Sequence, residues 1–185
     1  MDEQVYLAAL AGLLHDIGKF AQRAGWMTGA HAEVGGEFVR RYVPSAWRQR
    51  LYPVMGHHDE PLQGRETKMV ALADRLSAAE RSRADEVGPQ QLLSIFCSLE
   101  ISGLRVPRGR YWPLAPLSLK EEALFPGEKK PADAVEEGYQ ALWQAFAEEA
   151  QRLGTAHEQG GWLPAYLESL LLLMQRYTWC IPSAY

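Results

Sequence analysis

An apolar helical run that ends in a histidine and an aspartate is the feature that most constrains how this chain can fold. The run has the three- and four-residue spacing of one face of an α-helix, at Leu7, Leu10, Ala11 and Leu14. His15 and Asp16 follow directly. Neighbouring residues point about 100° apart around a helix axis, so both side chains can reach one ion beside the helix. The pattern predicts a helix over residues 3–24, capped by Asp2, that carries two potential metal ligands.

Further residues of metal-binding type follow this pair. The chain has His15-Asp16-Ile17-Gly18-Lys19, then His31, then the doublet His57-His58, and then Asp74 in an apolar helical segment. This order resembles the HD superfamily of metal-dependent phosphohydrolases, in which HD-x-G-K precedes a lone histidine, a histidine doublet and a late aspartate. The resemblance implies an all-α, HD-superfamily helical domain that hydrolyses phosphate esters.

The resemblance also implies a ligand set for one or two ions. The first ion is expected to be held by His15, Asp16 and Asp74, with Asp16 bridging to the second. The ligands expected for the second ion are His31, His57 and His58. Imidazoles with a few carboxylates suit Mn, Fe, Co, Ni or Zn better than Mg or Ca, which prefer oxygen ligands. A divalent transition metal is therefore the expected cofactor.

Asp16 and Lys19 are the residues expected to act in catalysis. Two neighbouring ions lower the pKa of a water between them and polarise the phosphoryl group. Asp16 is expected to bridge those ions. Lys19, one helical turn after His15, can hold a phosphate oxygen or the attacking water. The alternative for Lys19 is a solvated lysine without a role.

The chain departs from the superfamily pattern before the His-Asp pair. Most HD domains have a further ligand on a preceding helix, whereas no histidine occurs here before His15. Either the site is incomplete, or the helix order is permuted and the missing ligand comes from the C-terminal part. His157 is the one unassigned histidine and is a possible extra ligand, although it lies in a segment bounded by glycines.

Three segments resemble a narrower group within the superfamily. Residues 8–20, 73–81 and 177–183 are similar to the N-terminal HD domain of the large signature subunit of type III, Csm-type CRISPR effector complexes. The resemblance implies a permuted HD arrangement and a metal-dependent nuclease for single-stranded DNA in antiviral defence. Its expected partners are single-stranded DNA, the palm domains of the same subunit, and other effector subunits with guide RNA. Nothing here resembles the cyclase motif of those palm domains, so no cyclic-oligoadenylate synthesis is expected.

Two other functions remain open from the sequence. One is a nucleotide or cyclic-nucleotide phosphohydrolase of the HD superfamily, and the other is a catalytically degenerate HD domain that only docks partners. A nucleic-acid substrate is favoured by basic residues beside aromatic ones, which suit single strands: Arg105, Arg108 and Arg110 with Tyr111 and Trp112. The alternative is a solvated loop.

The rest of the chain is predicted to be helical and to form one domain over residues 1–185. The further helices are expected at residues 31–43, 45–51, 66–81, 133–153 and 164–177, with an irregular or hairpin insertion around residues 95–118. Caps at Ser45 and Asp133, a stop at Pro53 and an end at Gly154 set the expected boundaries. The helix over 66–81 is expected to bury Met69, Val70, Ala73, Leu76 and Ala79. Gly35-Gly36 suggests close approach of another backbone, that of the first helix.

Composition places the chain among cytoplasmic globular proteins. A net charge of −4 argues against a broadly basic surface. Cys97 and Cys180 are too few for a disulfide framework and are expected to be buried thiols in a reducing compartment. The acidic N-terminus lacks a secretory pattern, and the most apolar window, residues 163–174, is too short to span a membrane.

The last nine residues are unusually apolar for a chain end. This pattern predicts that the chain is a domain of a larger subunit, with the surface near Trp179 and Ile181 covered by the next domain. The isolated domain is then expected to expose that surface and to dimerise weakly.

Overall fold

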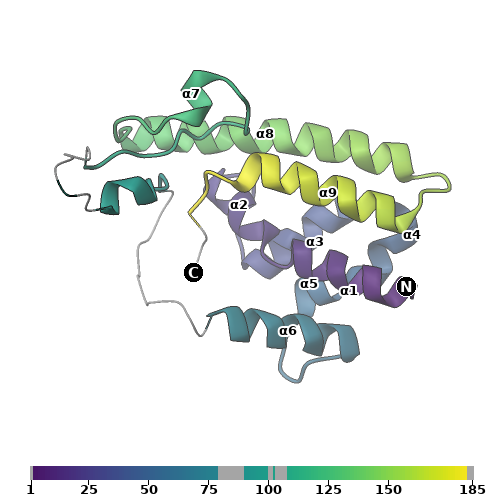
Figure 1. Cartoon of the computed structure of the whole chain (residues 1–185). Helices are drawn as coiled ribbons and strands as arrows, with labels where there is room; N and C mark the ends of the chain where they lie inside the picture. The colour runs from purple at the N-terminus through teal and green to yellow at the C-terminus, as the bar shows by residue number, and fades with distance from the viewer. Residues whose placement is uncertain (1, 79–89, 100–101, 103–107, 183–185) are drawn as a thin grey trace.

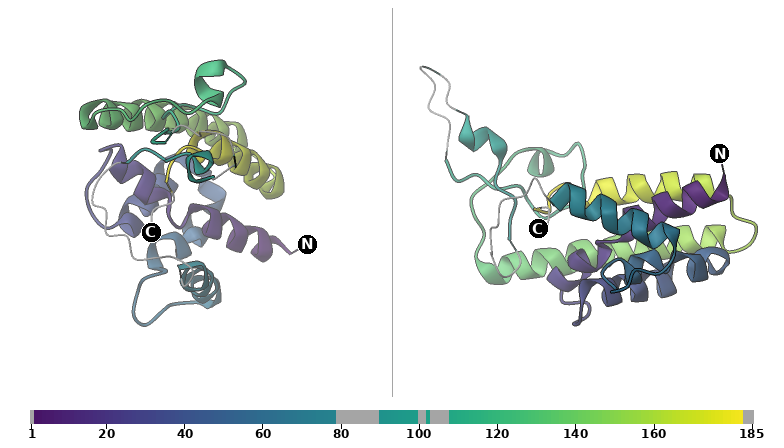
Figure 2. Two further views of the ribbon diagram at one scale, coloured as in Figure 1. Left: turned by 60° about the vertical axis from the view of Figure 1, so that its left-hand side comes forward. Right: turned by 90° about the horizontal axis from the view of Figure 1, so that it is seen from below.

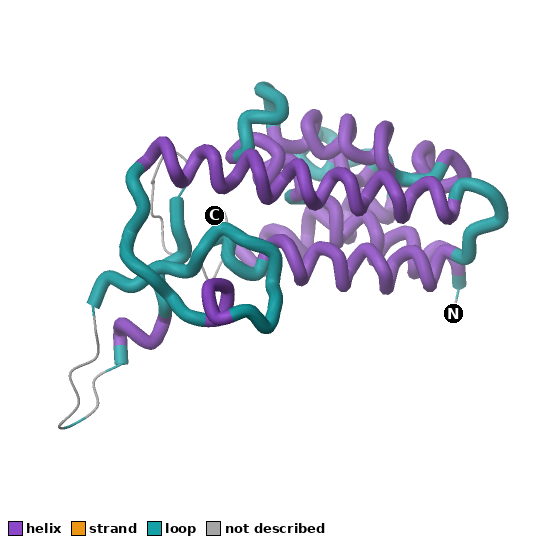
Figure 3. Tube along the Cα trace, turned by 90° about the horizontal axis from the view of Figure 1, so that it is seen from above, coloured by secondary structure: helices purple, strands orange, loops and turns teal. Residues whose placement is uncertain are grey.

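The computed structural model describes residues 2–78, 90–99, 102 and 108–182, and in these ranges the chain is helical. Figure 3 shows helices joined by loops, with no strand in the described part. Its only β-type pairing there consists of isolated bridges from Tyr111 to Leu93 and to Gly127. The all-α prediction is confirmed.

The helices and 3-10 turns follow one another in this order: α1 (Glu3–Leu14), α2 (Ile17–Arg23), α3 (His31–Tyr42), α4 (Ser45–Arg48), η1 (Gln49–Leu51), α5 (Pro53–Gly56), α6 (Arg65–Ala78), η2 (Ile95–Ser98), α7 (Glu121–Leu124), α8 (Ala132–His157) and α9 (Leu163–Thr178). In the described residues none of these helices is long and apolar enough to cross a membrane.

The two C-terminal helices form an antiparallel pair that covers the N-terminal helices (Figures 1 and 2). α9 packs on α1, and α8 packs on α2 and α3. α8 buries apolar residues that recur at helical spacing along one face: Val135, Tyr139, Leu142, Trp143 and Phe146. Full burial of one large apolar side chain stabilises a fold by about 1.5–3 kcal/mol. The shared core therefore fixes the N-terminal helices relative to one another.

The predicted first helix is interrupted at His15 and Asp16, which corrects the expectation of one helix over residues 3–24. Asp2 caps α1 as predicted, accepting a hydrogen bond from the Gln4 amide at 3.2 Å. The backbone leaves the helical path at Asp16 (φ −105°, ψ 6°), which is the residue before α2. The Asp16 carbonyl accepts a hydrogen bond from the Lys19 amide at 2.9 Å, the first of the new helix. The apolar spacing continues across the break, so periodicity did not reveal it.

A close contact between α2 and α3 places His31 beside this break. A Cβ on Gly18 would lie 1.9 Å from the His31 carbonyl oxygen, and one on Gly35 would lie 3.8 Å from the Gly18 amide nitrogen. The expected backbone approach is confirmed for Gly35. At Gly36 the space is filled by the Met55 side chain instead.

Several predicted boundaries are wrong. Ser45 is the first residue of α4, and Pro53 begins α5, where its fixed φ suits the first turn. α8 starts one residue before Asp133 and continues past Gly154 to His157. Gly154 is needed within the helix because a Cβ there would lie 2.1 Å from the Tyr42 carbonyl oxygen.

α6 lies at the edge of the domain, with one side on α1 and α5 (Figure 1). Of the predicted stripe, Val70 is buried, but Met69 and Leu76 are 50% and 64% exposed and Ala73 is also exposed. Ala79 lies outside the described residues. The stripe prediction is wrong because α6 is covered on one side by few elements, whereas α8 is packed in the core.

The insertion is irregular, as predicted, and Leu114 within it lies beside Gly138 of α8, whereas η2 stands away from that helix (Figure 2). It also contacts the residue that follows α9: the Trp179 indole donates to the Ala115 carbonyl at 2.9 Å, and its ring packs on Trp112. Trp179 and Ile181 are half-buried by this packing, and the covering of their remaining surface by a following domain stays a prediction. Cys180 is fully buried and Cys97 partly buried, and both are free thiols.

Candidate metal centre

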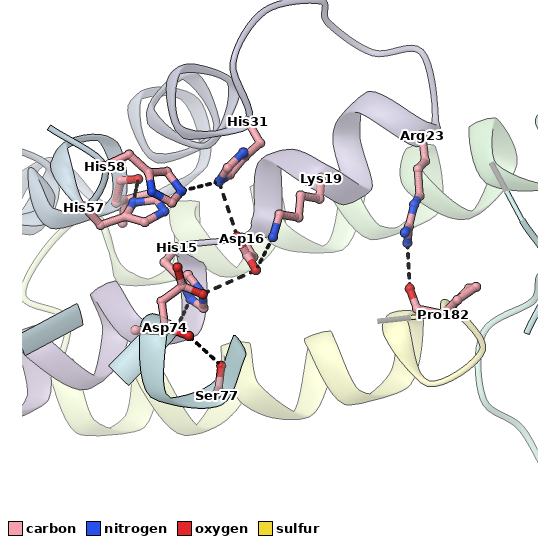
Figure 4. A network of polar contacts seen from close by, with 12 residues as sticks. His15, Asp16, Lys19, Arg23, His31, His57, His58, Asp74, Ser77 and Pro182 are labelled. Carbon is pink, nitrogen blue, oxygen red and sulfur yellow. Dashed lines mark hydrogen bonds and ion pairs between the residues drawn. The ribbon is translucent and has the colours of Figure 1, made fainter. Parts of the chain in front are cut away.

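Six predicted ligands from five segments meet at the break between α1 and α2 (Figure 4). His15 closes α1, and Asp16 lies between α1 and α2. The other four come from the start of α3, the end of α5 and the middle of α6: His31, His57, His58 and Asp74. The side chains of these six residues form two groups of three, and within each group the ligand atoms lie within 4.8 Å of one another.

The first group contains His15, Asp16 and Asp74. His15 Nε2 lies 3.4 Å from an Asp16 carboxylate oxygen and 3.6 Å from an Asp74 carboxylate oxygen. This is the set expected for the first ion. The one nitrogen and two carboxylates give it an anionic character.

The second group contains His31, His57 and His58. The Nε2 atoms of His31 and His58 are 3.1 Å apart. The other Asp16 carboxylate oxygen lies 3.5 Å from His31 Nε2. The Asp16 carboxylate therefore stands between the two groups, where a bridging ligand would stand.

Backbone carbonyls fix the tautomers of two of these histidines. The Nδ1 atoms of His15 and His57 lie 2.7 Å and 2.9 Å from the carbonyls of Gly12 and Val54. A carbonyl only accepts hydrogen bonds, so each Nδ1 carries the proton and each neutral ring presents a lone pair at Nε2. Metal-bound histidines are oriented in this way.

Three buried polar atoms in the centre lack a hydrogen-bond partner among the described residues. They are His15 Nε2, Asp16 Oδ1 and His57 Nε2. Buried polar atoms nearly always have a partner, and those that lack one call for an explanation such as an ion. Nitrogen and carboxylate lone pairs that face one another fit a transition-metal site.

The protonation states of three predicted ligands, His31, His57 and Asp16, suit metal binding. Burial and the Lys19 ammonium lower the pKa of His31 to about 4, and burial and His58 lower the pKa of His57. Burial would raise the pKa of Asp16, but the neighbouring His15 imidazole and the hydrogen-bonded Lys19 ammonium hold it well below its ordinary value. For His15, the effect of burial is outweighed by Asp16, and its pKa is raised. Ligands must be deprotonated to bind metal. At neutral pH the side chains of His31, His57 and Asp16 are deprotonated.

Lys19 is tied to the centre by an ion pair of 2.8 Å with Asp16. Its ammonium thus lies beside a predicted bridging ligand. In contrast, His157 packs its ring on Tyr166 and belongs to neither group. Within the described residues, neither group contains a residue after Asp74.

The described residues among those predicted to bind nucleic acid belong to the insertion and not to the two groups. Arg105 lies outside the described residues, Arg108 is exposed, and Arg110 is half-buried in the insertion. Sequence reasoning missed two features of the site. The carbonyls three residues before His15 and His57 orient those rings, and Arg23 lines a cavity beside Lys19. The helical spacing of Lys19 and Arg23 was the available signal for the second.

Comparison with known proteins defines the class. Residues 1–79 match the HD domain family. Together with the helical fold and the ordered His/Asp cluster, this match shows that the chain contains an HD domain. Part of the domain is also similar to Ribonuclease Y of Aquifex aeolicus, with 41% identity over 75 residues that cover 40% of this chain and 12% of that protein.

A more particular similarity extends over nearly the whole chain. The single-strand-specific deoxyribonuclease Cas10/Csm1 of the subtype III-A CRISPR system of Methanocaldococcus jannaschii is 31% identical over 94% of this chain and 23% of its own length. In the crystal structure of the apo Csm1-Csm4 cassette, the matching chain has a TM-score of 0.64 at 24% identity, over 99% of this chain and 24% of that one. The predicted resemblance to the Csm-type HD domain is confirmed. The chain spans about a quarter of the length of these relatives.

Proposed function

We propose that this chain is a metal-dependent nuclease that hydrolyses phosphodiester bonds of single-stranded DNA in CRISPR antiviral defence. The main support is the convergence of His15 Nε2, Asp16 Oδ1 and His57 Nε2, which are buried without hydrogen-bond partners among the described residues. A docking module has no need for such a costly arrangement, because each buried unsatisfied polar group costs about 1–3 kcal/mol. This argues against the degenerate alternative.

We assign one ion to His15, Asp16 and Asp74, with Asp16 shared. The second would be held by His31, His57 and His58. When bound, Mn, Fe, Co, Ni or Zn ions would supply Lewis acidity toward a phosphoryl oxygen and lower the pKa of a bound water.

The side chains of the centre have separable tasks in this proposal. The Gly12 and Val54 carbonyls hold His15 and His57 with Nε2 directed inward. Lys19 keeps Asp16 ionised and is placed to donate to a non-bridging phosphate oxygen, stabilising the charge that grows there in the transition state. Lys19 would therefore bind substrate as well as orient Asp16.

The substrate and partners are proposed from the relatives. Cas10/Csm1 of M. jannaschii is named as a single-strand-specific deoxyribonuclease, and the structural neighbours include chains of Csm1-Csm4 cassettes. We propose that these residues act in the cytoplasm as the HD domain of a larger subunit. Its partners would be palm domains and other effector subunits with guide RNA.

The test compares the wild type with His15→Ala/Asp16→Ala after Mn²⁺ loading. Substrates are labelled single-stranded DNA, duplex DNA, single-stranded RNA and free nucleotides. The proposal expects cleavage of single-stranded DNA by the wild type and its loss in the double variant. His157→Ala, a histidine outside both groups, is the matched control and should cleave normally. Equal cleavage by the double variant would refute the assignment, and a preference for RNA or free nucleotides would reassign the substrate.

A further inference from the structure

A cavity of about 240 Å³ lies beside the metal centre, between α2 and the end of α9. Asp16, Lys19 and Arg23 provide its polar wall. The rest of the lining is mainly apolar and comes from α1 and α2 and from α9 and the residues after it: Leu13, Phe20, Met174, Ile181 and Pro182. Because Asp16 and Lys19 belong to both, the cavity is continuous with the candidate metal centre.

The Arg23 side chain is half-buried in this cavity lining, and the two groups that it contacts, a carbonyl and a hydroxyl, are neutral. Its guanidinium donates to the Pro182 carbonyl at 2.8 Å. It also lies near the Tyr139 hydroxyl, where it opposes the burial that raises the pKa of Tyr139 to about 12. Among the described residues no carboxylate forms an ion pair with Arg23, whereas Lys19 pairs with Asp16. A charge removed from water without a counterion is costly, so the position favours an anionic ligand.

Three other arginines in the first half of the chain are already paired with carboxylates. Arg40 and Arg41 contact Glu37, and Arg50 contacts Glu3. Arg23 differs from them because its positive charge is not paired with a carboxylate of the described residues and can bind an anionic ligand. Its side chain lines the cavity.

Lys19 and Arg23 project from α2 on the same side, as Figure 4 shows. Residues four apart on a helix lie about 6 Å apart along its axis. This is near the length of one nucleotide step in an extended single strand. The two cations can therefore contact successive phosphates of one strand.

We propose that Arg23 binds the phosphate next to the scissile one, and that the cavity holds the sugar and base between them. This inference rests on the proposed nuclease function and names a substrate subsite for it. The apolar residues of the cavity would contact the flat face of the base and would not recognise its hydrogen-bonding edge. The volume is below the roughly 300–1,000 Å³ of pockets for drug-sized ligands, which suits a single nucleotide unit.

A structural role for Arg23 is the competing explanation, since it ties Pro182 to α2. Two variants separate the roles. Arg23→Gln keeps a donor for the Pro182 carbonyl but removes the charge. Arg23→Lys keeps the charge but loses the planar guanidinium. Arg152→Ala, at an exposed arginine on α8 outside this cavity, is the matched control.

The experiment measures cleavage with Mn²⁺ on two substrates. A single-stranded oligothymidylate has flanking phosphates, whereas bis(p-nitrophenyl) phosphate has only the scissile one. Arg23→Gln should raise KM for the oligonucleotide about tenfold, the effect of one charge-assisted hydrogen bond, and change KM for the small ester much less. Arg23→Lys should recover part of the loss, and Arg152→Ala should match the wild type. Equal losses on both substrates, or no loss on either, would overturn the proposal.

A binding measurement keeps this inference separate from the nuclease proposal. Fluorescence anisotropy with labelled oligothymidylate in EDTA requires no cleavage. Arg23→Gln should weaken binding and reduce the dependence of log K on log salt by about 0.7, as expected for loss of one single-strand phosphate contact. If the wild type cleaves nothing but this loss is seen, the subsite stands and the nuclease proposal fails. Unchanged affinity and salt dependence would reject the subsite.

Discussion

Substitution of Gly18 by alanine tests whether the α2–α3 contact sets the geometry of the centre. A Cβ at position 18 would lie 1.9 Å from the His31 carbonyl oxygen, and real Cβ contacts essentially never fall below 3.0 Å. The backbones must therefore separate by about 1 Å. Overpacking of this kind costs about 1–3 kcal/mol, partly offset by up to about 1 kcal/mol of helix propensity. We expect Gly18→Ala to lower Tm by a few degrees.

The same displacement should weaken metal binding more than it weakens the fold. His31 begins α3, and its Nε2 lies 3.5 Å from Asp16, so a shift of about 1 Å spoils their placement around a shared ion. Misplacement by 1 Å at a reacting centre can reduce activity about 100-fold. Calorimetric Mn²⁺ titration and thermal melts measure the two effects.

Gly12→Ala is the matched control for this experiment. It also changes a helical glycine near the centre, but nothing lies within 4 Å of the added Cβ. It should be neutral or stabilising by up to about 1 kcal/mol. If Gly18→Ala is as stable as Gly12→Ala and binds Mn²⁺ like the wild type, the reasoning from the contact is refuted.

Three further predictions concern the ions, the substrate and pH. Asp74→Ala removes an anionic ligand of the first group and should lower metal content by elemental analysis; wild-type content would exclude Asp74. Single-stranded DNA should be cleaved faster than a matched duplex, because a flexible strand reaches a centre recessed among helices more easily; equal rates would contradict this. In EDTA, stability should fall as pH drops from about 6.5 to about 4, since unfolded chains take up a proton at His31 that the folded protein resists. In denaturant titrations, His31→Asn should reduce the change of unfolding free energy with pH over this range. An unchanged pH dependence would show that other groups cause it.

Sequence reasoning was most successful where chemistry and local pattern agreed. The order of His15-Asp16, His31, His57-His58 and Asp74 predicted which side chains meet, and the structure brings all six together. The apolar residues of α8 that recur at helical spacing are buried because this helix packs against the core.

The failures have tertiary causes. The break at Asp16 is invisible to a periodicity that continues through it, and α6 looks amphipathic although little covers it. Gly154 suggested a helix end, but its role is contact with the Tyr42 backbone. The pairs of Glu37 with Arg40 and Arg41 have the three- and four-residue spacing of one helix face, but the pair of Arg50 with Glu3 depends on the fold and is not evident from spacing.

The shallow attachment of α6 has a consequence for how the centre exchanges its ions. α6 buries few side chains, Thr67, Val70 and Ala71, yet it supplies Asp74 to the first group. An ion held by Asp74 and by residues of the packed N-terminal helices would fasten α6 to the rest of the domain. Elements with little buried surface open first in native proteins. Loss of the ion would then let α6 separate from the rest of the domain. The backbone amides of α6 would exchange with solvent earlier than those of α1 and α3.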